Sequence, residues 1–307
     1  MRTAFIKALV ELATNDPRIL LLTGDLGYMV IEPYVERFSD RFINVGVAEQ
    51  NMVGLATGLA EAGFIPFIYS IAPFAALRPF EFIRNGPVYH QLPVRIVGVG
   101  QGVEYGFNGH SHFGVDDVGV LRTQPGLAII APADDIQAIT AIEKTRDLMG
   151  PVYFRLSKDS FEIPNLSRSF ELGQTQRIGN GKDVLILSTG AITREAIRAA
   201  QLLSEHGLAT TILVIASIAP APVSDLIEAL SAFKFAFTVE SHYITGGIGS
   251  LVAEIVADYG LNIQVVRLGF GTLLNNSLGS SSYLHDTNGL SAEKISLHIT
   301  KTLEENA

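Results

Sequence analysis

Hydrophobic positions along the chain alternate between short apolar runs and segments with helical spacing. The apolar runs are rich in Val, Ile and Leu, which is typical of strands buried on both faces of a parallel sheet. They predict strands near residues 19–22, 41–43, 65–69, 94–99, 127–130 and 152–155. The segments between them predict helices near residues 4–12, 78–91, 115–122 and 134–148. This alternation predicts a parallel sheet that is covered by helices on both faces.

A second alternation follows a polar interruption. Residues 158–180 are richer in Ser, Asn, Gln and charged residues, and Pro164 lies among them, so this segment predicts a linker. Strands are then expected near residues 183–187, 210–215, 235–239 and 263–267, and helices near 191–206, 222–231, 247–259 and 291–303. We therefore predict two α/β domains, residues 1–172 and 173–307, each with a mostly parallel sheet flanked by helices.

Composition narrows the class of protein. The 307 residues are 48% hydrophobic and include 29 glycines, which suits a globular α/β protein large enough for two domains. No apolar run approaches the roughly 20 residues that span a bilayer, and the start of the chain lacks the pattern of a cleavable signal. A net charge of −9 argues against nucleic acid and anionic membranes as partners. The absence of cysteine excludes disulfides and thiolate metal sites and fits a cytoplasmic protein.

One carboxylate lies in an otherwise apolar, glycine-containing segment. Glu49 belongs to the stretch Val45-Gly46-Val47-Ala48-Glu49-Gln50-Asn51, which leads into a helix predicted over residues 52–60 and places Glu49 on its first turn. That helix carries small and apolar residues on nearly every face, which predicts that most of its faces are buried. An isolated buried carboxylate is costly unless it is paired or protonated. Two explanations remain open at this point: an acid that offsets the helix dipole, or an acid kept for proton chemistry.

Two glycine-rich loops follow predicted strands. Gly98-Val99-Gly100-Gln101-Gly102 lacks the spacing of a nucleotide-binding loop, and favours close approach of a ligand or of neighbouring backbone. In Gly106-Phe107-Asn108-Gly109-His110-Ser111-His112-Phe113, the two histidines are placed to reach one ligand. No third metal ligand stands nearby, so contact with a substrate is favoured over metal binding. Two exposed histidines without a role are the plain alternative.

An aromatic residue follows the strand predicted near residues 65–69. Phe74 comes after Tyr69-Ser70-Ile71-Ala72-Pro73, beyond the carboxyl end of that strand. This position suits a ring that covers a planar ligand, because ligands of open parallel sheets bind at the carboxyl ends of the strands. Packing in the core is the alternative.

Taken together, these motifs resemble the transketolase family. The segment around Glu49, the run from Pro66 to Phe74 and the loop that ends at His112 are similar, in this order, to the pyrimidine-binding domain of that family. The second half resembles its C-terminal domain through Thr238-Val239-Glu240-Ser241-His242-Tyr243-Ile244-Thr245-Gly246-Gly247-Ile248-Gly249-Ser250. The likeness covers essentially the whole chain. The family's diphosphate-binding domain, with its Gly-Asp-Gly start, is missing from this sequence.

The resemblance implies a role for each candidate residue. Glu49 is expected to hydrogen-bond a ring nitrogen of the aminopyrimidine of thiamine diphosphate and to drive its imino tautomer, which then deprotonates the thiazolium carbon. Phe74 would stack on the pyrimidine beside Ile71, and Asp25 would also contact the cofactor. His112 corresponds to the family's substrate-facing histidine. Further substrate contacts are expected from Asn108, His110, Arg2 and Lys158.

Two departures from the family pattern bear on the substrate. Asn108 stands where transketolases usually carry Asp. Lys158 replaces the Arg of the family's Leu-Ser-Arg, so a planar fork becomes a point charge. The acceptor is therefore left open among a sugar phosphate, a sugar with another anionic group and a modified sugar.

As a whole, the resemblance implies the C-terminal subunit of a split, thiamine-diphosphate-dependent transketolase that transfers a two-carbon ketol unit between sugars or sugar phosphates. Activity would require a separate N-terminal subunit, which holds the diphosphate and its Mg²⁺ or Ca²⁺, in a heterotetramer. A β-type subunit of a 2-oxo acid dehydrogenase, or an enzyme similar to deoxyxylulose-phosphate synthase, is the alternative among enzymes. A non-catalytic regulatory relative is the alternative of another class, and the presence of Glu49 argues against it. Glu240 and His242 are expected to serve the packing of domains and subunits.

Overall fold

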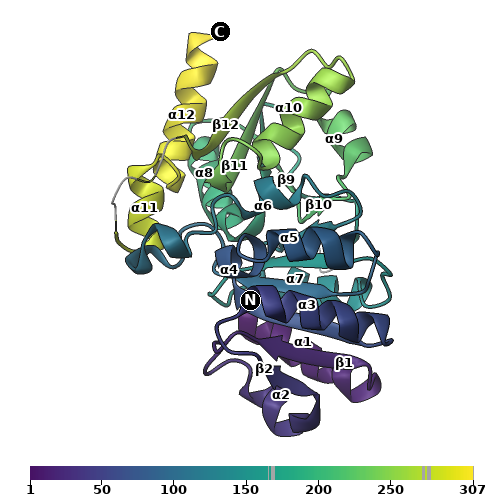
Figure 1. Ribbon diagram of the computed structural model, residues 1–307. Coiled ribbons are helices and arrows are strands. Elements are labelled where there is room, and N and C mark those ends of the chain that lie inside the picture. Colours follow the sequence, from purple (N-terminus) through teal and green to yellow (C-terminus); the bar gives the residue numbers. More distant parts are fainter. Residues whose placement is uncertain (165, 167–169, 272–273, 275–277, 307) are drawn as a thin grey trace.

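The computed structural model describes residues 1–164, 166, 170–271, 274 and 278–306. Within them, two sheets flanked by helices form the two halves of the chain, which lie one beyond the other in Figure 1. The predicted α/β class is confirmed. No helix in the described part of the chain is long and apolar enough to cross a membrane.

The first half alternates strands and helices as the hydrophobic pattern predicts. Its elements are α1 (Arg2–Asn15), β1 (Ile19–Thr23), α2 (Glu32–Arg37), η1 (Ser39–Arg41), β2 (Phe42–Asn44), α3 (Glu49–Glu61), β3 (Ile65–Ile71), α4 (Ala72–Ala76), α5 (Phe80–Ile83), η2 (Arg84–Val88), β4 (Arg95–Val99), η3 (Gly106–Asn108), η4 (His110–His112), α6 (Asp117–Leu121), β5 (Ala128–Ile130), α7 (Asp135–Lys144) and β6 (Val152–Leu156). The helix expected over residues 78–91 is shorter, and its second part, η2, is a π-helical turn around Pro87. Proline lacks the N–H that a regular helix requires there.

The second half repeats the alternation around a smaller sheet. Its elements are β7 (Gln176–Ile178), β8 (Val184–Ser188), η5 (Gly190–Ile192), α8 (Thr193–Glu205), β9 (Thr210–Val214), β10 (Ser217–Ala219), α9 (Val223–Leu230), β11 (Phe235–Tyr243), α10 (Ile248–Asp258), β12 (Gln264–Phe270), α11 (Ser281–Thr287) and α12 (Ala292–Glu305). Apart from β10, these strands form one sheet in the order β12-β11-β8-β9-β7.

The larger sheet has the strand order β10-β5-β6-β4-β3-β1-β2. Strands β1 to β6 pair in parallel, and every residue of β1, β4 and β6 is buried. Burial on both faces explains why these strands are continuous apolar runs. Because they run in the same direction, their carboxyl ends lie at one edge of the sheet.

Strand β10 joins the two halves. It belongs to the second half in sequence but pairs antiparallel with β5 of the first sheet, through Ser217 opposite Ile130 and Ala219 opposite Ile129. The hydrophobic pattern does not predict this strand, because Ile218 is the one large apolar residue among its three. The first sheet is therefore completed by a segment from beyond its own half.

The predicted linker over residues 158–180 is wrong in its last part. Residues 176–178 form β7, an antiparallel edge strand in which Gln176 lies opposite Val214 of β9. Edge strands are commonly short and polar, so their composition is similar to that of a linker. Residues 165 and 167–169 of the predicted linker lie outside the described residues.

Helix α3 is less buried than its composition predicts. Its buried side chains lie on one face at helical spacing, and they are Glu49, Met52, Val53, Ala56 and Ala60. On the opposite face Gly54, Leu55 and Gly58 are exposed in this single chain. Within the single chain α3 therefore buries one face, and burial of its other faces stays a prediction for the assembled protein.

Candidate functional site

Five loops of the first half meet at the carboxyl edge of its sheet. Asp25 follows β1, Glu49 follows β2, Phe74 follows β3, His112 follows β4 and Lys158 follows β6. Sheets of this kind bind ligands beyond the carboxyl ends of their strands. The order of the elements therefore brings the candidate residues to one edge of the sheet.

Glu49 is the first residue of α3 and is 3% exposed. No side chain caps this helix, so its free N–H groups and its dipole favour a negative charge at this position. Ser70, near the end of β3, donates its hydroxyl to Glu49 Oε1 at 3.3 Å. On another side, a Cβ at Gly24 would lie 3.6 Å from the same oxygen. The carboxylate is therefore enclosed between a helix start and the ends of two strands.

Arg78 reaches this carboxylate from the segment after α4. Its Nη1 lies 3.2 Å from Glu49 Oε1 and 3.1 Å from Oε2, while its Cζ lies 3.7 Å from the centre of the Phe74 ring. The Arg78 side chain is 44% exposed. Sequence reasoning missed this residue. No motif indicated it, because Arg78 lies in the turn between α4 and α5 and its contacts arise from the folding of that turn.

His112 stands beside the same aromatic ring. The rings of His112 and Phe74 lie edge to face, with their centres 5.0 Å apart. His112 Nδ1 lies 3.0 Å from the hydroxyl of Ser111. Burial, and then the charge of Arg78, lower the pKa of His112 below its ordinary value. The imidazole is therefore neutral near pH 7 and is able to accept or donate a proton.

Tyr105 connects His112 to the basic residues of the site. Its ring centre lies 6.1 Å from that of His112, and Lys158 Nζ lies 4.2 Å from the same Tyr105 centre. The N–H of Arg2 donates to Ser157 O at 3.3 Å, next to Lys158. Burial raises the pKa of Tyr105, and the nearby charge of Arg2 opposes that rise. Two cationic side chains thus border the tyrosine.

Glu104 is a further carboxylate that sequence reasoning missed. It accepts hydrogen bonds from Ser157 Oγ at 2.6 Å and from the N–H of Lys158 at 2.7 Å. Desolvation raises the pKa of Glu104 to about 7, although both hydrogen bonds lower it. Glu104 therefore fixes the backbone that carries Lys158. No spacing in its glycine-rich surroundings indicates this contact.

The remaining candidates lie at the rim of the site. Asn108 and His110 are exposed in η3 and η4, and Ile71 is the half-buried last residue of β3. Asp25 is exposed and is paired with Asn44: its N–H donates to Asn44 Oδ1 at 3.0 Å, and its Oδ1 accepts from Asn44 Nδ2 at 3.2 Å.

The structure thus brings Glu49, Phe74 and His112 together, with Lys158 against the ring of Tyr105 and Arg2 bonded to the backbone of Ser157. Within the described residues, no group of three or more His, Asp or Glu side chains is placed to hold a metal ion. A buried carboxylate beside an aromatic face and a neutral imidazole can bind a flat, nitrogen-containing ring and share a proton with it.

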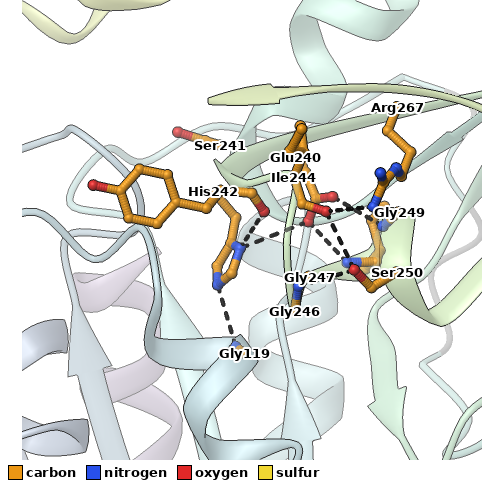
Figure 2. Close-up of polar contacts among 12 residues, drawn as sticks. Gly119, Glu240, Ser241, His242, Ile244, Gly246, Gly247, Gly249, Ser250 and Arg267 are labelled. Atoms are coloured by element: carbon orange, nitrogen blue, oxygen red, sulfur yellow. Dashed lines mark hydrogen bonds and ion pairs between the residues drawn. The ribbon is translucent and has the colours of Figure 1, made fainter. Parts of the chain in front are cut away.

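A second buried carboxylate lies in the C-terminal half (Figure 2). Glu240, in β11, accepts hydrogen bonds from the N–H groups of Ile248 and Gly249 at 2.8 and 2.9 Å, at the start of α10. Burial raises the pKa of Glu240 to about 7 against the effect of these bonds. A Cβ at Gly247 would overlap Glu240 Oε2, so only glycine fits there. Backbone groups occupy this carboxylate, which indicates a structural role.

His242 and Arg155 join the two halves. His242 Nε2 accepts the N–H of Gly119 in α6 at 3.2 Å, while its Nδ1 lies 2.7 Å from Tyr243 O (Figure 2). Burial lowers the pKa of His242 to about 4, so this histidine is neutral and carries its hydrogen on Nδ1. Arg155 pairs with the fully buried Asp117 at 2.9 Å and donates to Ser241 O at 3.0 Å. These contacts agree with the domain-packing role expected for this region, and contact with other subunits stays a prediction.

Comparison with known proteins assigns both halves. Residues 1–163 match the family model for "Transketolase, pyrimidine binding domain", and residues 173–305 match "Transketolase, C-terminal domain". An apulose-4-phosphate transketolase subunit of Actinobacillus succinogenes is 33% identical over 86% of this chain and 86% of its own length. A 6-deoxy-6-sulfo-D-fructose transketolase subunit of a Clostridium species is 32% identical over 96% of this chain and 92% of its own length.

A solved structure leads to the same family. It is described as "Split gene transketolase, inactive beta4 tetramer" and resembles this chain with a TM-score of 0.88 at 34% identity, over 99% of this chain and 98% of the other. The resemblance inferred from the sequence motifs is confirmed. The chain belongs to the transketolase family and comprises its pyrimidine-binding and C-terminal domains.

Proposed function

We propose that this chain is the C-terminal subunit of a split transketolase, which uses thiamine diphosphate to transfer a two-carbon ketol unit between sugars. It works together with a separate subunit that holds the diphosphate and its Mg²⁺ or Ca²⁺. The observation that carries the proposal is the position of Glu49: a buried carboxylate at the start of α3, whose partner Arg78 lies on the ring of Phe74.

The described residues fit the aminopyrimidine end of thiamine diphosphate. A flat, nitrogen-rich group, the guanidinium of Arg78, already lies on the Phe74 ring and contacts both oxygens of Glu49. An aminopyrimidine is also flat and nitrogen-rich, so the same two residues suit it. When bound, the cofactor supplies the nucleophilic carbon that takes up the two-carbon unit.

Each residue of the site has a task in this proposal. Glu49 holds a proton at the ring nitrogen that faces it, and its burial excludes water that would otherwise compete for that proton. Phe74 orients the ring plane by stacking. His112, which is neutral near pH 7, exchanges a proton with an oxygen of the sugar.

The basic residues favour a sugar that carries an anionic group. Lys158 Nζ lies against the ring of Tyr105, Arg2 contacts the backbone of Ser157 next to Lys158, and Glu104 fixes the backbone of Lys158. The names of the two relatives include a phosphate and a sulfo group, both of them anions. A lysine ammonium is a point charge without the forked geometry of arginine, so it suits either anion. We propose an anionic sugar as substrate on this basis.

Exposed apolar residues support contact with the diphosphate-binding subunit. Val47, two residues before Glu49, is 72% exposed, and Tyr28 and Leu55 are 85% and 38% exposed. Large apolar side chains that a single chain leaves exposed are candidates for contact with another chain. Both relatives are named as subunits. We propose a heterotetramer in which the partner completes each site at this surface.

Replacing Glu49 tests the proposal. In the chain mixed with its diphosphate-binding subunit, Glu49→Gln should lower kcat for ketol transfer by at least about 100-fold, because it removes a group that holds a proton. Glu61→Gln, at the other end of α3, makes the same change at an exposed position and should leave kcat unchanged. Size-exclusion chromatography should show intact assemblies for both variants. A Glu49→Gln rate within threefold of the wild type would remove Glu49 from the mechanism.

A further inference from the structure

Arg78 fills the space between the two residues that bind the pyrimidine in the proposed function. Its guanidinium carbon lies 3.7 Å from the centre of the Phe74 ring, and its Nη1 lies within 3.2 Å of both Glu49 oxygens. An aminopyrimidine that stacks on Phe74 and hydrogen-bonds Glu49 needs the same ring face and the same oxygens. The two groups therefore exclude each other.

We infer that Arg78 is a placeholder for the aminopyrimidine: it occupies Glu49 and Phe74 until the cofactor enters, and then swings outward. This inference rests on the proposed function, which gives Glu49 and Phe74 their ligand. It adds a control on cofactor loading that lies within this chain.

The cost of an unpaired buried charge explains why a placeholder is useful. Glu49 is 3% exposed, and a buried carboxylate without a partner is strongly unfavourable. Among the described residues, Arg78 is the cation that contacts it, and Ser70 adds one neutral hydrogen bond. A guanidinium also stacks well on an aromatic face. Arg78 thus stabilises the empty site in the same way that a flat, nitrogen-rich ligand does.

The difference in exposure indicates which partner moves. Arg78 is 44% exposed, whereas Glu49 is enclosed by α3, Ser70 and Gly24. Arg78 can rotate into solvent without moving the backbone, but Glu49 cannot. Since the cofactor binds only molecules from which Arg78 has withdrawn, its apparent affinity falls by the fraction of open sites. Arg78 therefore weakens cofactor binding, and in the chain without cofactor it compensates the buried charge of Glu49.

The chain alone tests the first half of this inference. Arg78→Met keeps a long apolar side chain but removes the charge, and it should lower the melting temperature by roughly 3 °C or more. In a Glu49→Gln background the same change should cost far less, because no buried charge is left to compensate. Arg177→Met, at an exposed position on β7, is the matched control and should change neither background. Equal losses from Arg78→Met in both backgrounds would overturn the pairing.

Calorimetry on the chain mixed with the diphosphate-binding subunit tests the second half, with thiamine diphosphate as the probe. Arg78→Met should tighten its Kd by about tenfold, as expected if roughly one site in ten is open in the wild type. An unchanged or weaker Kd would overturn the placeholder, since the guanidinium would then not compete with the ring. If the wild-type mixture does not bind thiamine diphosphate, the proposed function itself fails, and that outcome is distinct from an unchanged Kd in a mixture that binds.

Discussion

Glu49 and Glu240 are both buried glutamates, but their partners differ: Glu49 begins α3, whereas Glu240 lies in β11 and faces the start of α10. Glu240 accepts two backbone N–H groups of α10, at 2.8 and 2.9 Å, from positions that cannot move without unwinding the helix. Glu49 accepts from two side chains, and one of these, Arg78, is 44% exposed. Backbone groups of α10 therefore occupy the Glu240 carboxylate, whereas the Glu49 carboxylate is held by a side chain that can move away.

This difference separates a structural acid from a candidate catalytic acid. Burial alone does not distinguish them, since both residues are at most 3% exposed. What distinguishes them is whether a ligand can replace the hydrogen-bond partner. A carboxylate whose donors are helix N–H groups has no free position for a ligand. A carboxylate whose donor is a mobile side chain can bind a ligand that displaces this side chain.

Removing the structural acid should have the largest effect on stability. Glu240→Ala leaves the N–H groups of Ile248 and Gly249 without their acceptor, so the free energy of unfolding should fall by about 2–4 kcal/mol. Glu254→Ala, on the helix whose first N–H groups Glu240 accepts, is the matched control, because Glu254 is 55% exposed and its pair with Arg122 should contribute less than about 1 kcal/mol. Urea unfolding measures both changes. Equal losses would mean that Glu240 is no more structural than a surface acid.

His242 and Glu240 should each give the free energy of unfolding a smaller dependence on pH, and the two dependences have opposite signs. Burial holds the pKa of His242 at about 4, below the usual 6.5, so stability linked to this group is present above pH 6.5 and is lost as pH falls toward 4. The pKa of Glu240 is raised from 4.5 to about 7, so the stability linked to it is present below pH 4.5 and is lost as pH rises toward 7. Between pH 4.5 and 6.5 the two contributions oppose each other.

Replacing Glu240 or His242 alone should therefore change the slope of stability against pH in opposite directions. Relative to the wild type, Glu240→Gln should increase the slope of the free energy of unfolding against pH, and His242→Gln should decrease it. Each change should be up to about 1.4 kcal/mol per pH unit. His298→Gln, at an exposed position on α12, should change no slope. Urea midpoints measured at half-unit steps from pH 4.5 to 6.5 give the slopes. Two variants with the same sign of change would contradict these titrations.

The main strands and most helices could be predicted because they are long enough to show a period. The pattern places Ile19–Thr23 and Val184–Ser188 within one residue of their bounds. It misses β7 and β10, three residues each, because their pairing is set by neighbours distant in sequence. It also predicts more burial of α3 than the single chain shows, since small residues suit an exposed face as well as a buried one.

The sequence could predict only those residues of the candidate site that belong to a recognisable motif. Glu49, Phe74 and His112 stand in such motifs, and their roles stay predictions. Arg78 and Tyr105 have no signature of their own, and their contacts arise from the packing of loops that follow different strands. Glu104 is missed for the same reason: its partners, Ser157 and Lys158, are more than fifty residues away in sequence.

The central claim is that Glu49 belongs to half of an active site, and that another chain supplies the rest. The most direct measurement is calorimetric binding of thiamine diphosphate to this chain alone, to the diphosphate-binding subunit alone and to their equimolar mixture. The account predicts that the mixture binds at least about tenfold more tightly than either subunit, and that Glu49→Gln weakens binding in the mixture only. Binding to this chain alone with the affinity of the mixture would contradict it.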